Sequence, residues 1–329
     1  MCEFAIVERF GRRLEIDEKE KTIENYKSDI SNFLRSIGKK INSDNEQIIL
    51  KAIDPFLVED EFIEYRKKYT MSTYNRKVVS LRKFGIYLQD MGVTTLNCFK
   101  SLTMFKTKKV RAEKRERVHR DSFTAEEINN IIKYVIDECD KKTTSVYVKL
   151  KLLRTALLIT SMCSTGMRIS EISNIKMEEL EPVFENDKKI GMMAKISNHK
   201  TLEFTGEKRA YFSNKTYILL EKYLEVREII SEKIKEGYED YLIISSTYKK
   251  MDQKSSLNNI KAICKEVGID KYIVNHSGRV TFRTLATDAG VPEVYIRMIG
   301  GWSTSVLEES YIYSREQDVK LCTYCGKLF

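Results

Sequence analysis

The sequence predicts a mainly α-helical protein of two domains, with one small antiparallel β-sheet in the second domain. Apolar residues recur at helical spacing through most of the chain, and one segment alternates with a period of two. A strongly basic run separates two regions with helical apolar patterning. At 329 residues, the chain is long enough for each domain to bury its own core. We expect domains at 1–105 and 122–329, joined by a linker at 106–121.

The first domain is expected to consist of short amphipathic helices. The segment from Thr22 to Leu34 carries apolar residues on one stripe and Lys and Ser on the other face, which predicts a helix. Its stripe consists of Ile23, Tyr26, Ile30, Phe33 and Leu34.

A second helix of this domain is expected at 72–91. The apolar positions near helical spacing are Tyr74, Val78, Leu81, Phe84, Ile86 and Leu88. Four cations are expected on the outer face, namely Arg76, Lys77, Arg82 and Lys83. A basic face of this kind suits contacts to DNA phosphates or bases, although ordinary solvation of a surface helix explains it almost as well.

The expected linker is the most basic part of the chain. Residues 106–120 contain eight Lys or Arg and two Glu, in a chain of net charge +9 and pI near 9.0. A polyanion at this segment would meet a high positive potential, so nucleic acid is the expected partner, with a merely solvated tether as the alternative. The candidate DNA contacts are Lys106, Lys108, Lys109, Arg111, Lys114, Arg115 and Arg117.

The second domain is expected to begin with a helix near residue 125. Thr124 can cap this helix, and Glu127, three residues later, can close a capping box. The nearly all-apolar stretch at 149–161 predicts a buried helix. It is followed by an expected turn at 163–166, after which Arg168 begins the next helix.

The period of two occurs at 188–212 and predicts a β-hairpin. One limb carries Ile190, Met192, Ala194 and Ile196, and the other carries Ala210 and Phe212. The connecting segment at 198–209 contains Lys200 followed by Thr201. Beyond it the pattern is again helical from 217 to 230, and Pro292 indicates a helix break.

The residues that can carry chemistry occur in this second domain. Arg168 follows Thr165-Gly166, Arg279 ends a His276-Ser277-Gly278-Arg279 box, and Tyr311 lies nine residues after Trp302. A lone Arg or His is more often structural. Attack on a DNA phosphodiester, however, needs a nucleophile, fixed cations around the phosphate oxygens and an acid for the leaving oxygen, and the chain offers a candidate for each.

Together with the Lys200-Thr201 pair in the expected hairpin, these motifs resemble the tyrosine recombinases of the phage integrase family, in the compact two-domain layout of the Xer and Cre type. The resemblance covers nearly the whole chain. It implies an all-helical, SAM-like core-binding domain and a catalytic domain of the DNA breaking-rejoining fold. The implied function is site-specific recombination through a 3′-phosphotyrosine, in integration or excision of a mobile genetic element or in dimer resolution.

The resemblance also implies roles for the residues around the phosphate. Arg168 and Arg279 would grip the non-bridging oxygens, and Glu171 would hold the Arg168 guanidinium in place. Lys200 would protonate the departing 5′ oxygen, with Lys195 and Lys208 as rivals on the same hairpin.

The remaining implied roles concern proton transfer and nucleophilic attack. His276 would accept or relay the phenolic proton or donate to the phosphate, while the Trp302 indole could only donate a hydrogen bond. Tyr311 would be the nucleophile, with Tyr313 as its competitor.

Two positions depart from the family pattern. Gly278 stands where Leu is common, at a cost of about 1 kcal/mol relative to Ala inside a helix, and Val280 stands where His is common. Neither change removes a catalytic group.

The C-terminal tail carries Cys322 and Cys325 in a CxxC arrangement without a second ligand pair nearby, so no metal site is expected. By analogy with the family, the tail is expected to dock into a neighbouring protomer. The apolar stripe available for this contact consists of Val319, Leu321, Leu328 and Phe329.

The expected partners are double-stranded DNA with a specific recombination site and three further protomers, which form a homo-tetramer on two sites; accessory DNA-bending proteins are a further candidate. No cofactor is expected. No segment approaches the ~18 apolar residues of a membrane span, and seven scattered Cys do not suggest a disulfide framework, so we expect a cytoplasmic protein.

Two other functions fit the same residues. A type IB topoisomerase shares the Arg, Lys, His and Tyr chemistry but acts as a monomer on any duplex. A catalytically silent DNA-binding regulator of a mobile element would keep the fold without the chemistry.

Overall fold

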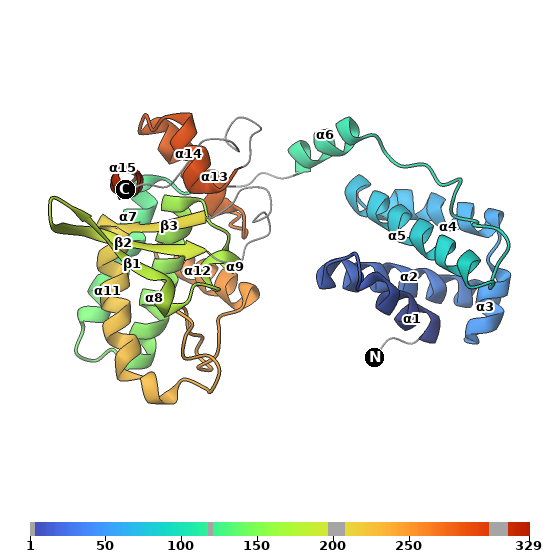
Figure 1. Ribbon diagram of the computed structural model, residues 1–329, viewed down its shortest axis with the longest axis horizontal. Helices are drawn as coiled ribbons and strands as arrows, with labels where there is room; N and C mark the ends of the chain where they lie inside the picture. The colour runs from blue at the N-terminus through green and yellow to red at the C-terminus, as the bar shows by residue number, and fades with distance from the viewer. Residues whose placement is uncertain (1–3, 118–120, 197–207, 303–314) are drawn as a thin grey trace. The chain divides into compact units, whose positions relative to one another are not determined.

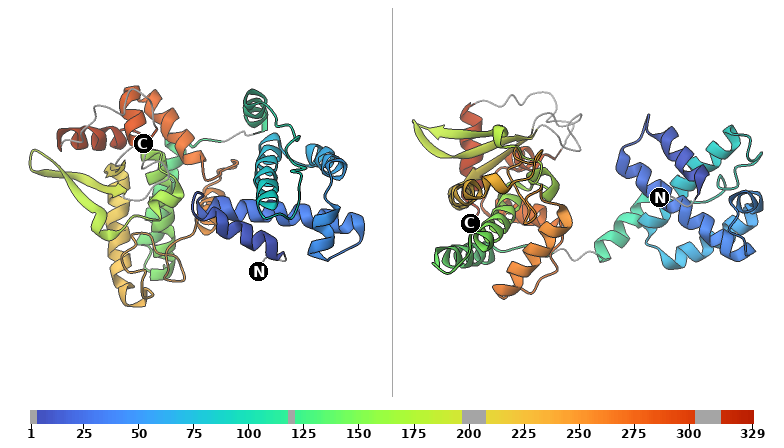
Figure 2. Two further views of the ribbon diagram at one scale, coloured as in Figure 1. Left: turned by 45° about the vertical axis from the view of Figure 1, so that its right-hand side comes forward. Right: turned by 90° about the horizontal axis from the view of Figure 1, so that it is seen from below.

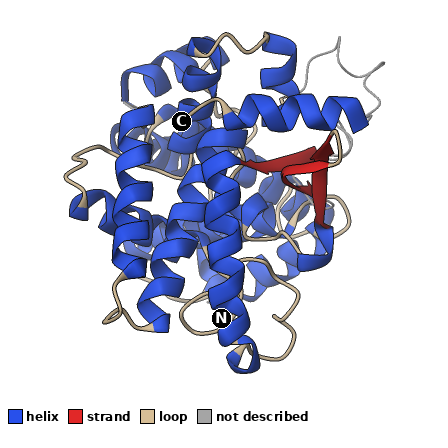
Figure 3. Cartoon of the chain, turned by 90° about the vertical axis from the view of Figure 1, so that its left-hand side faces the viewer, coloured by secondary structure: helices blue, strands red, loops and turns tan. Residues whose placement is uncertain are grey.

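The computed structural model describes residues 4–117, 121–196, 208–302 and 315–329, without the side chains of 114–117 and 315–317 (Figure 1). The described chain is mostly helical with one three-stranded antiparallel sheet, which confirms the expected fold class (Figure 3). It divides into two compact units at 1–119 and 120–329, and each is described by itself.

The first unit contains only helices in its described residues. They are α1 (Ala5–Leu14), α2 (Glu20–Ile41), α3 (Glu46–Ala52), α4 (Pro55–Lys68), α5 (Met71–Asp90) and α6 (Thr107–Arg117). The stripe expected on α2 is confirmed, because all five of its apolar side chains are buried. Aromatic side chains from α1, α4 and α5 pack edge-to-face in the same core, for example Phe10 against Phe84 and Phe62 against Tyr74.

Helix α5 differs from the expectation at two positions. Ile86, expected in the core, is 53% exposed, whereas Lys77, expected on the outer basic face, is only 3% exposed. The Lys77 ammonium is buried because it pairs with Asp29 on α2, with Nζ 3.1 Å from Oδ1, and lies over the rings of Tyr65 and Tyr69. The expectation that Lys77 lies on the outer face of this helix was therefore wrong.

The basic segment forms a helix rather than an irregular tether. Helix α6 covers most of it, and the backbone N–H of Met71 donates to Glu113 Oε2 at 2.9 Å. This bond joins α6 to the first turn of α5, within the first unit. The side chains of Lys108, Lys109 and Arg111 in α6, and of Lys106 just before it, are exposed.

The second unit begins as the sequence predicts. Helix α7 (Ala125–Asp140) has the expected capping box, in which Glu127 N–H donates to Thr124 Oγ1 and Thr124 N–H donates to Glu127 Oε2. Helix α8 (Val146–Thr165) is buried along its C-terminal half, as expected. It continues through Cys163, so the turn is confined to Gly166 and Met167.

The sheet contains the expected hairpin and one strand that the sequence patterns did not reveal. Its strands are β1 (Leu180–Glu185), β2 (Lys188–Ile196) and β3 (Lys208–Ser213), in the order β1-β2-β3. The hairpin register pairs Met192 with Phe212 and Ala194 with Ala210. Strand β1 was missed because only Val183 of its six residues is buried, which leaves no alternating pattern.

The two faces of the sheet pack against different helices (Figure 2). Ala210 and Phe212 join the core formed with α8 and α11 (Asn214–Ile229), whereas Tyr211 joins a smaller core formed with the C-terminal helices. The remaining helices of this unit are α9 (Ile169–Ile172), α12 (Gln253–Glu266), α13 (Ser277–Asp288), α14 (Glu293–Gly300) and α15 (Arg315–Gly326). The break expected near Pro292 is confirmed, since Pro292 is the N-cap of α14.

The tail packs onto its own chain. Leu321, Cys322, Cys325 and Leu328 are buried between α15 and the sheet. In this structure, then, the apolar stripe expected to dock into a neighbouring protomer is used within the chain.

Candidate active site

A buried carboxylate links two cations at the start of α9. Glu171 is 4% exposed; its Oε1 lies 2.5 Å from Arg168 Nη1, and its Oε2 accepts from Lys208 Nζ at 2.7 Å. The backbone N–H of Arg168 also donates to Oε2, at 2.9 Å. Glu171 therefore fixes both the backbone and the guanidinium of Arg168, which is the supporting position that the sequence analysis assigned to it.

The turn before Arg168 depends on Gly166. This residue ends α8 with φ at +64°, a conformation that other residues adopt only with strain. A Cβ at this position would also lie 2.6 Å from Cδ1 of Phe282 on α13. Gly166 thus allows the chain to reverse tightly and bring Arg168 next to α13.

Burial and charge act in opposite directions on the Glu171 and Lys208 pair. Burial alone would raise the pKa of Glu171, but the charge of Lys208 and the hydrogen bonds from Lys208 and Arg168 lower it to about 2. Burial lowers the pKa of Lys208 to about 8, although Glu171 counteracts this effect. At neutral pH both groups are charged, so Glu171 lies as an anion between the cations Lys208 and Arg168.

The HxxR box opens α13, and its glycine sets how closely this helix approaches α8. A Cβ on Gly278 would lie only 2.5 Å from Cβ of Met162. Helix α13 is further held by Thr281 Oγ1, which accepts from the backbone N–H of Phe123 at 2.9 Å. The departure from the family pattern at Gly278 therefore permits close helix packing that seats Arg279.

Arg279 is the most constrained cation of the site. It is 4% exposed, and its Nη1 is buried without a hydrogen-bond partner in the described structure. Its Cζ lies 4.9 Å from the centre of the Trp302 ring. Burial, together with the nearby charge of Arg168, lowers the pKa of Arg279 to about 10. Since an unpartnered buried guanidinium N–H is costly, an anion contacting Nη1 would stabilise the site.

Arg279 lines an open cavity of about 520 Å³ on the surface of α13. Exposed His276 and half-buried Trp302 lie at the same cavity, so the structure brings these three predicted residues together. The lining residues are His276, Arg279, Val280, Arg283, Thr284, Thr287, Asp288 and Trp302.

Some predicted residues cannot be placed. Lys200, Tyr311 and its competitor Tyr313 lie outside the described residues. So do the side chains of Lys114, Arg115 and Arg117.

The other cations expected on α5 are engaged within the first unit. Arg76 Nη1 lies 2.8 Å from Asp29 Oδ2, and Lys83 pairs with Glu18. Arg82 donates to the carbonyl oxygens of Lys100 and Leu102.

Sequence reasoning missed a cation at the cavity and underrated another in the site. Arg283 lines the cavity with its Cζ 5.9 Å from the Trp302 ring centre, and its position four residues after Arg279 was the available signal. Lys208 was considered only as a rival to Lys200, and no pattern along the chain indicated its contact with Glu171.

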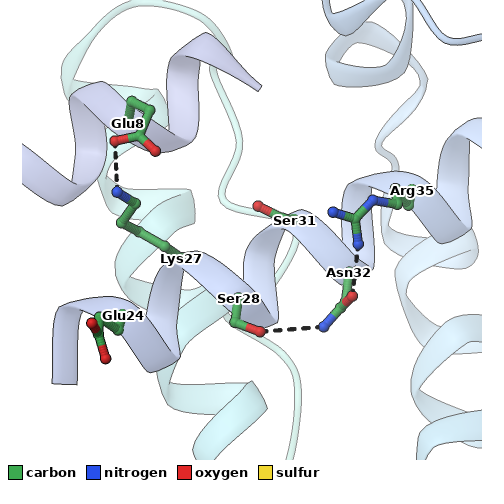
Figure 4. A pocket seen from close by; sticks show the side chains of 7 residues that line it. All are labelled: Glu8, Glu24, Lys27, Ser28, Ser31, Asn32 and Arg35. Carbon is green, nitrogen blue, oxygen red and sulfur yellow. Dashed lines mark hydrogen bonds and ion pairs between the residues drawn. The ribbon is translucent and has the colours of Figure 1, made fainter. Parts of the chain in front are cut away.

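A second pocket, of about 350 Å³, lies on the outer side of α1 and α2 in the first unit (Figure 4). Lys27 pairs with Glu8 at 2.6 Å, and Arg35 donates to Asn32 Oδ1 at 2.9 Å. Two Glu, one Lys and one Arg line it, so its charges balance and give no preference for phosphate.

Within the described ranges, no cluster of His, Cys, Asp and Glu has the arrangement of a metal site. Burial raises the pKa of Cys322 to about 12 and holds that of Cys325 well above its ordinary value, which disfavours the thiolates that zinc requires. Nor does any helix of the described residues have the length and apolarity that crossing a bilayer requires.

Comparison with known proteins identifies the family. Residues 121–318 match the Phage integrase family. Tyrosine recombinase XerC of Leptospira interrogans is 23% identical over 310 residues, which span 94% of this chain and 88% of the relative.

Two solved structures share the fold. The XerH site-specific recombinase bound to palindromic difH substrate, in a post-cleavage complex, matches with a TM-score of 0.60 and 17% identity, covering 93% of this chain and 76% of that one. A lambda integrase tetramer bound to a Holliday junction matches with a TM-score of 0.57 and 14% identity, covering 94% and 79%. The chain belongs to the phage integrase family and is a tyrosine recombinase, an enzyme that breaks and rejoins DNA strands.

Proposed function

We propose that this recombinase cleaves one specific DNA site by attack of the Tyr311 phenol on the scissile phosphate, forming a 3′-phosphotyrosyl bond and releasing a 5′ hydroxyl. The observation that carries the proposal is the buried Nη1 of Arg279, which has no hydrogen-bond partner among the described residues, beside the Glu171-fixed Arg168. Two guanidinium groups held in this way suit the non-bridging oxygens of a phosphate as negative charge builds up in the transition state.

The other groups would supply proton transfer and orientation. His276, exposed at the cavity, is suited to accept the phenolic proton or donate to the phosphate near neutral pH. Lys200 would protonate the leaving 5′ oxygen, and the Trp302 indole would donate to the phosphate. Rejoining reverses the attack, because the phosphotyrosyl bond conserves the energy of the broken phosphodiester.

The assembly that we propose follows the relatives. XerH and lambda integrase were solved on DNA, the latter as a tetramer on a Holliday junction, and we propose a homo-tetramer on two duplex sites for this chain. Accessory DNA-bending proteins would bring the sites together where they lie far apart. Its DNA substrate, and the six buried free thiols of the described residues, fit a reducing cytoplasm.

Covalent trapping tests the chemistry. The protein is incubated with nicked suicide duplexes taken from its own genetic neighbourhood, and any protein–DNA adduct is mapped by mass spectrometry. We expect an adduct at Tyr311 that is lost in Tyr311→Phe and retained in Tyr313→Phe. An adduct at Tyr313, or none on any duplex that is bound tightly, would contradict the assignment.

The same preparation separates the rival functions. Relaxation of supercoiled DNA by monomers, without site preference or synapsis, would indicate topoisomerase activity. A silent DNA-binding regulator would bind its site tightly and specifically without forming an adduct. Its regulatory activity would be unchanged in Tyr311→Phe.

A further inference from the structure

Lys208 connects two parts of the site that lie far apart in the sequence. Lys208 is only 3% exposed, and its Nζ donates to Glu171 Oε2 at 2.7 Å. The other carboxylate oxygen of Glu171 pairs with Arg168. Because Lys208 is the first residue of β3, the sheet fixes its backbone. The ammonium therefore reaches Arg168 through a single intervening carboxylate.

The aliphatic stem of the same side chain supports the turn before Trp302. A Cβ on Gly301 would lie 2.9 Å from Cδ and 3.3 Å from Nζ of Lys208, so only a glycine can approach this closely. Gly301 ends α14 with φ at +61°, and Trp302, which follows, stacks near Arg279. One side chain thus contacts the element that presents Trp302 as well as the carboxylate that orients Arg168.

We propose that Lys208 is a positioning residue for DNA cleavage. Its charge keeps Glu171 ionised and directed at Arg168, and its stem holds the Gly301 turn, so it acts through Arg168 and Trp302 rather than on the leaving oxygen. This inference rests on the proposed function of the site.

The burial of Lys208 argues against the alternative role of general acid. An acid must contact the departing 5′ oxygen, whereas the Lys208 ammonium is enclosed and bonded to a carboxylate. Without Lys208, the buried Glu171 would lose one of its two cationic partners and would tend to take up a proton. Arg168 would then lose the ionic partner that fixes its guanidinium.

A substrate with sulfur in place of the bridging 5′ oxygen distinguishes the two roles. A thiolate leaves without a proton, because a thiol is far more acidic than an alcohol. Single-turnover cleavage is measured on the oxygen and sulfur duplexes for the wild type, Lys208→Met and Lys200→Met. We expect Lys208→Met to slow cleavage about 10- to 100-fold on both duplexes, as expected for misplaced groups. In Lys200→Met, sulfur should restore most of the lost rate.

Controls keep a folding defect separate from a role in cleavage. Lys188→Met changes an exposed lysine at the start of β2, in the same hairpin, and should leave both rates within about threefold of the wild type. The double variant Glu171→Gln/Lys208→Met removes both buried charges together, so it leaves no uncompensated ion. Its cleavage rate should fall by the same factor on the oxygen and sulfur duplexes.

Three outcomes decide the matter. Rescue of Lys208→Met by sulfur would make Lys208 the acid and overturn the inference, and an unchanged rate on both duplexes would also overturn it. In either case the wild-type adduct at Tyr311 would leave the proposed function intact. A wild type that forms no adduct on either duplex would overturn both.

Discussion

The charged side chains of the site are held by one another before any DNA arrives. Glu171 pairs with Arg168 and Lys208. Arg279 stacks beside Trp302, and its Nη1 has no hydrogen-bond partner within the part of the chain that the structure describes. Burying several charges is costly unless they are paired, so the carboxylate stabilises the fold while fixing the geometry. The phosphate would then find Arg168 and Arg279 already oriented, which lowers the reorganisation needed in the transition state.

The Glu171 carboxylate should give the second unit an acid-dependent stability. Its folded pKa of about 2 lies below the usual value of 4.5, so its contribution is full above about pH 4.5 and is lost as the pH falls towards 2. Lys208 and Arg279 stay protonated throughout this range, because their pKa values of about 8 and about 10 lie above it. We expect Glu171→Gln to lower the unfolding free energy by on the order of 3 kcal/mol at pH 7. The difference in unfolding free energy between Glu171→Gln and the wild type should become smaller between pH 5 and pH 3.

Urea unfolding followed by fluorescence of Trp302, the single tryptophan of the chain, measures this in the second unit. Glu181→Gln, at the half-buried Lys195 pair, is the matched control and should change stability by less than about 1 kcal/mol. A gap for Glu171→Gln that stays constant from pH 7 to pH 3 would show that the carboxylate is not held ionised.

At the scale of elements, β3 joins the active site to the C-terminal helix. Successive side chains of a strand point to opposite faces, so Lys208 points towards Glu171 while Arg209 and Tyr211 point towards α15. Both of the latter donate to Asp318, Arg209 Nη1 at 2.5 Å and the Tyr211 hydroxyl at 2.8 Å. The helix that follows the Tyr311 segment is therefore fixed to the strand that carries Lys208.

Loss of this anchor should loosen α15. In Asp318→Ala, the carboxylate that accepts both hydrogen bonds is gone, while the apolar contacts of α15 remain. We expect Cys322 and Cys325, which are buried under α15, to react with a thiol reagent at least about tenfold faster, equivalent to about 1.4 kcal/mol of lost anchoring. Mass spectrometry of each labelled cysteine gives the rates.

Two controls distinguish local loosening of α15 from destabilisation of the whole unit. Cys163 and Cys264, in the other core of this unit, should keep their wild-type rates, and Asp270→Ala at an exposed position should change none. Equal acceleration at all four thiols would mean global destabilisation, and unchanged rates at Cys322 and Cys325 would mean that Asp318 does not anchor the helix.

At the scale of the whole molecule, the basic helix α6 is the candidate for contact with DNA phosphates that do not react. Lys106, Lys108, Lys109 and Arg111 are exposed. Replacing all four by Gln should weaken binding to every DNA sequence alike. Fluorescence anisotropy at several salt concentrations should show a slope of log affinity against log salt reduced by about three to four.

A matched variant shows whether position matters beyond net charge. It replaces four lysines already paired with carboxylates elsewhere, namely Lys21, Lys67, Lys141 and Lys222. Its slope should stay near that of the wild type. An equal reduction in both variants, or none in the α6 variant, would contradict phosphate contact by α6.

Local patterns in the sequence were sufficient where the structure follows nearest neighbours along the chain. The α2 stripe and the Thr124–Glu127 box depend on residues a few positions apart, and each limb of the hairpin depends on alternation within its own residues. The order and spacing of the motifs were enough to select Arg168, His276, Arg279 and Trp302 as candidates, and their catalytic roles stay predictions. The placement of Lys200 and Tyr311 in the site stays a prediction.

Contacts between distant segments were not encoded in any local pattern. Lys77 is buried because Asp29, 48 residues earlier, neutralises it, and Gly278 is required because α13 rests on Met162 of α8. In the sequence, Lys208 could not be distinguished from the two other hairpin lysines. In the structure, it contacts Glu171, which lies 37 residues earlier. The sequence by itself determined the helices, the hairpin and the family, since these rest on periodicity and on short motifs. Only the tertiary structure decided which charges are buried and paired, because the free energy of a buried charge depends on the partner that folding brings to it.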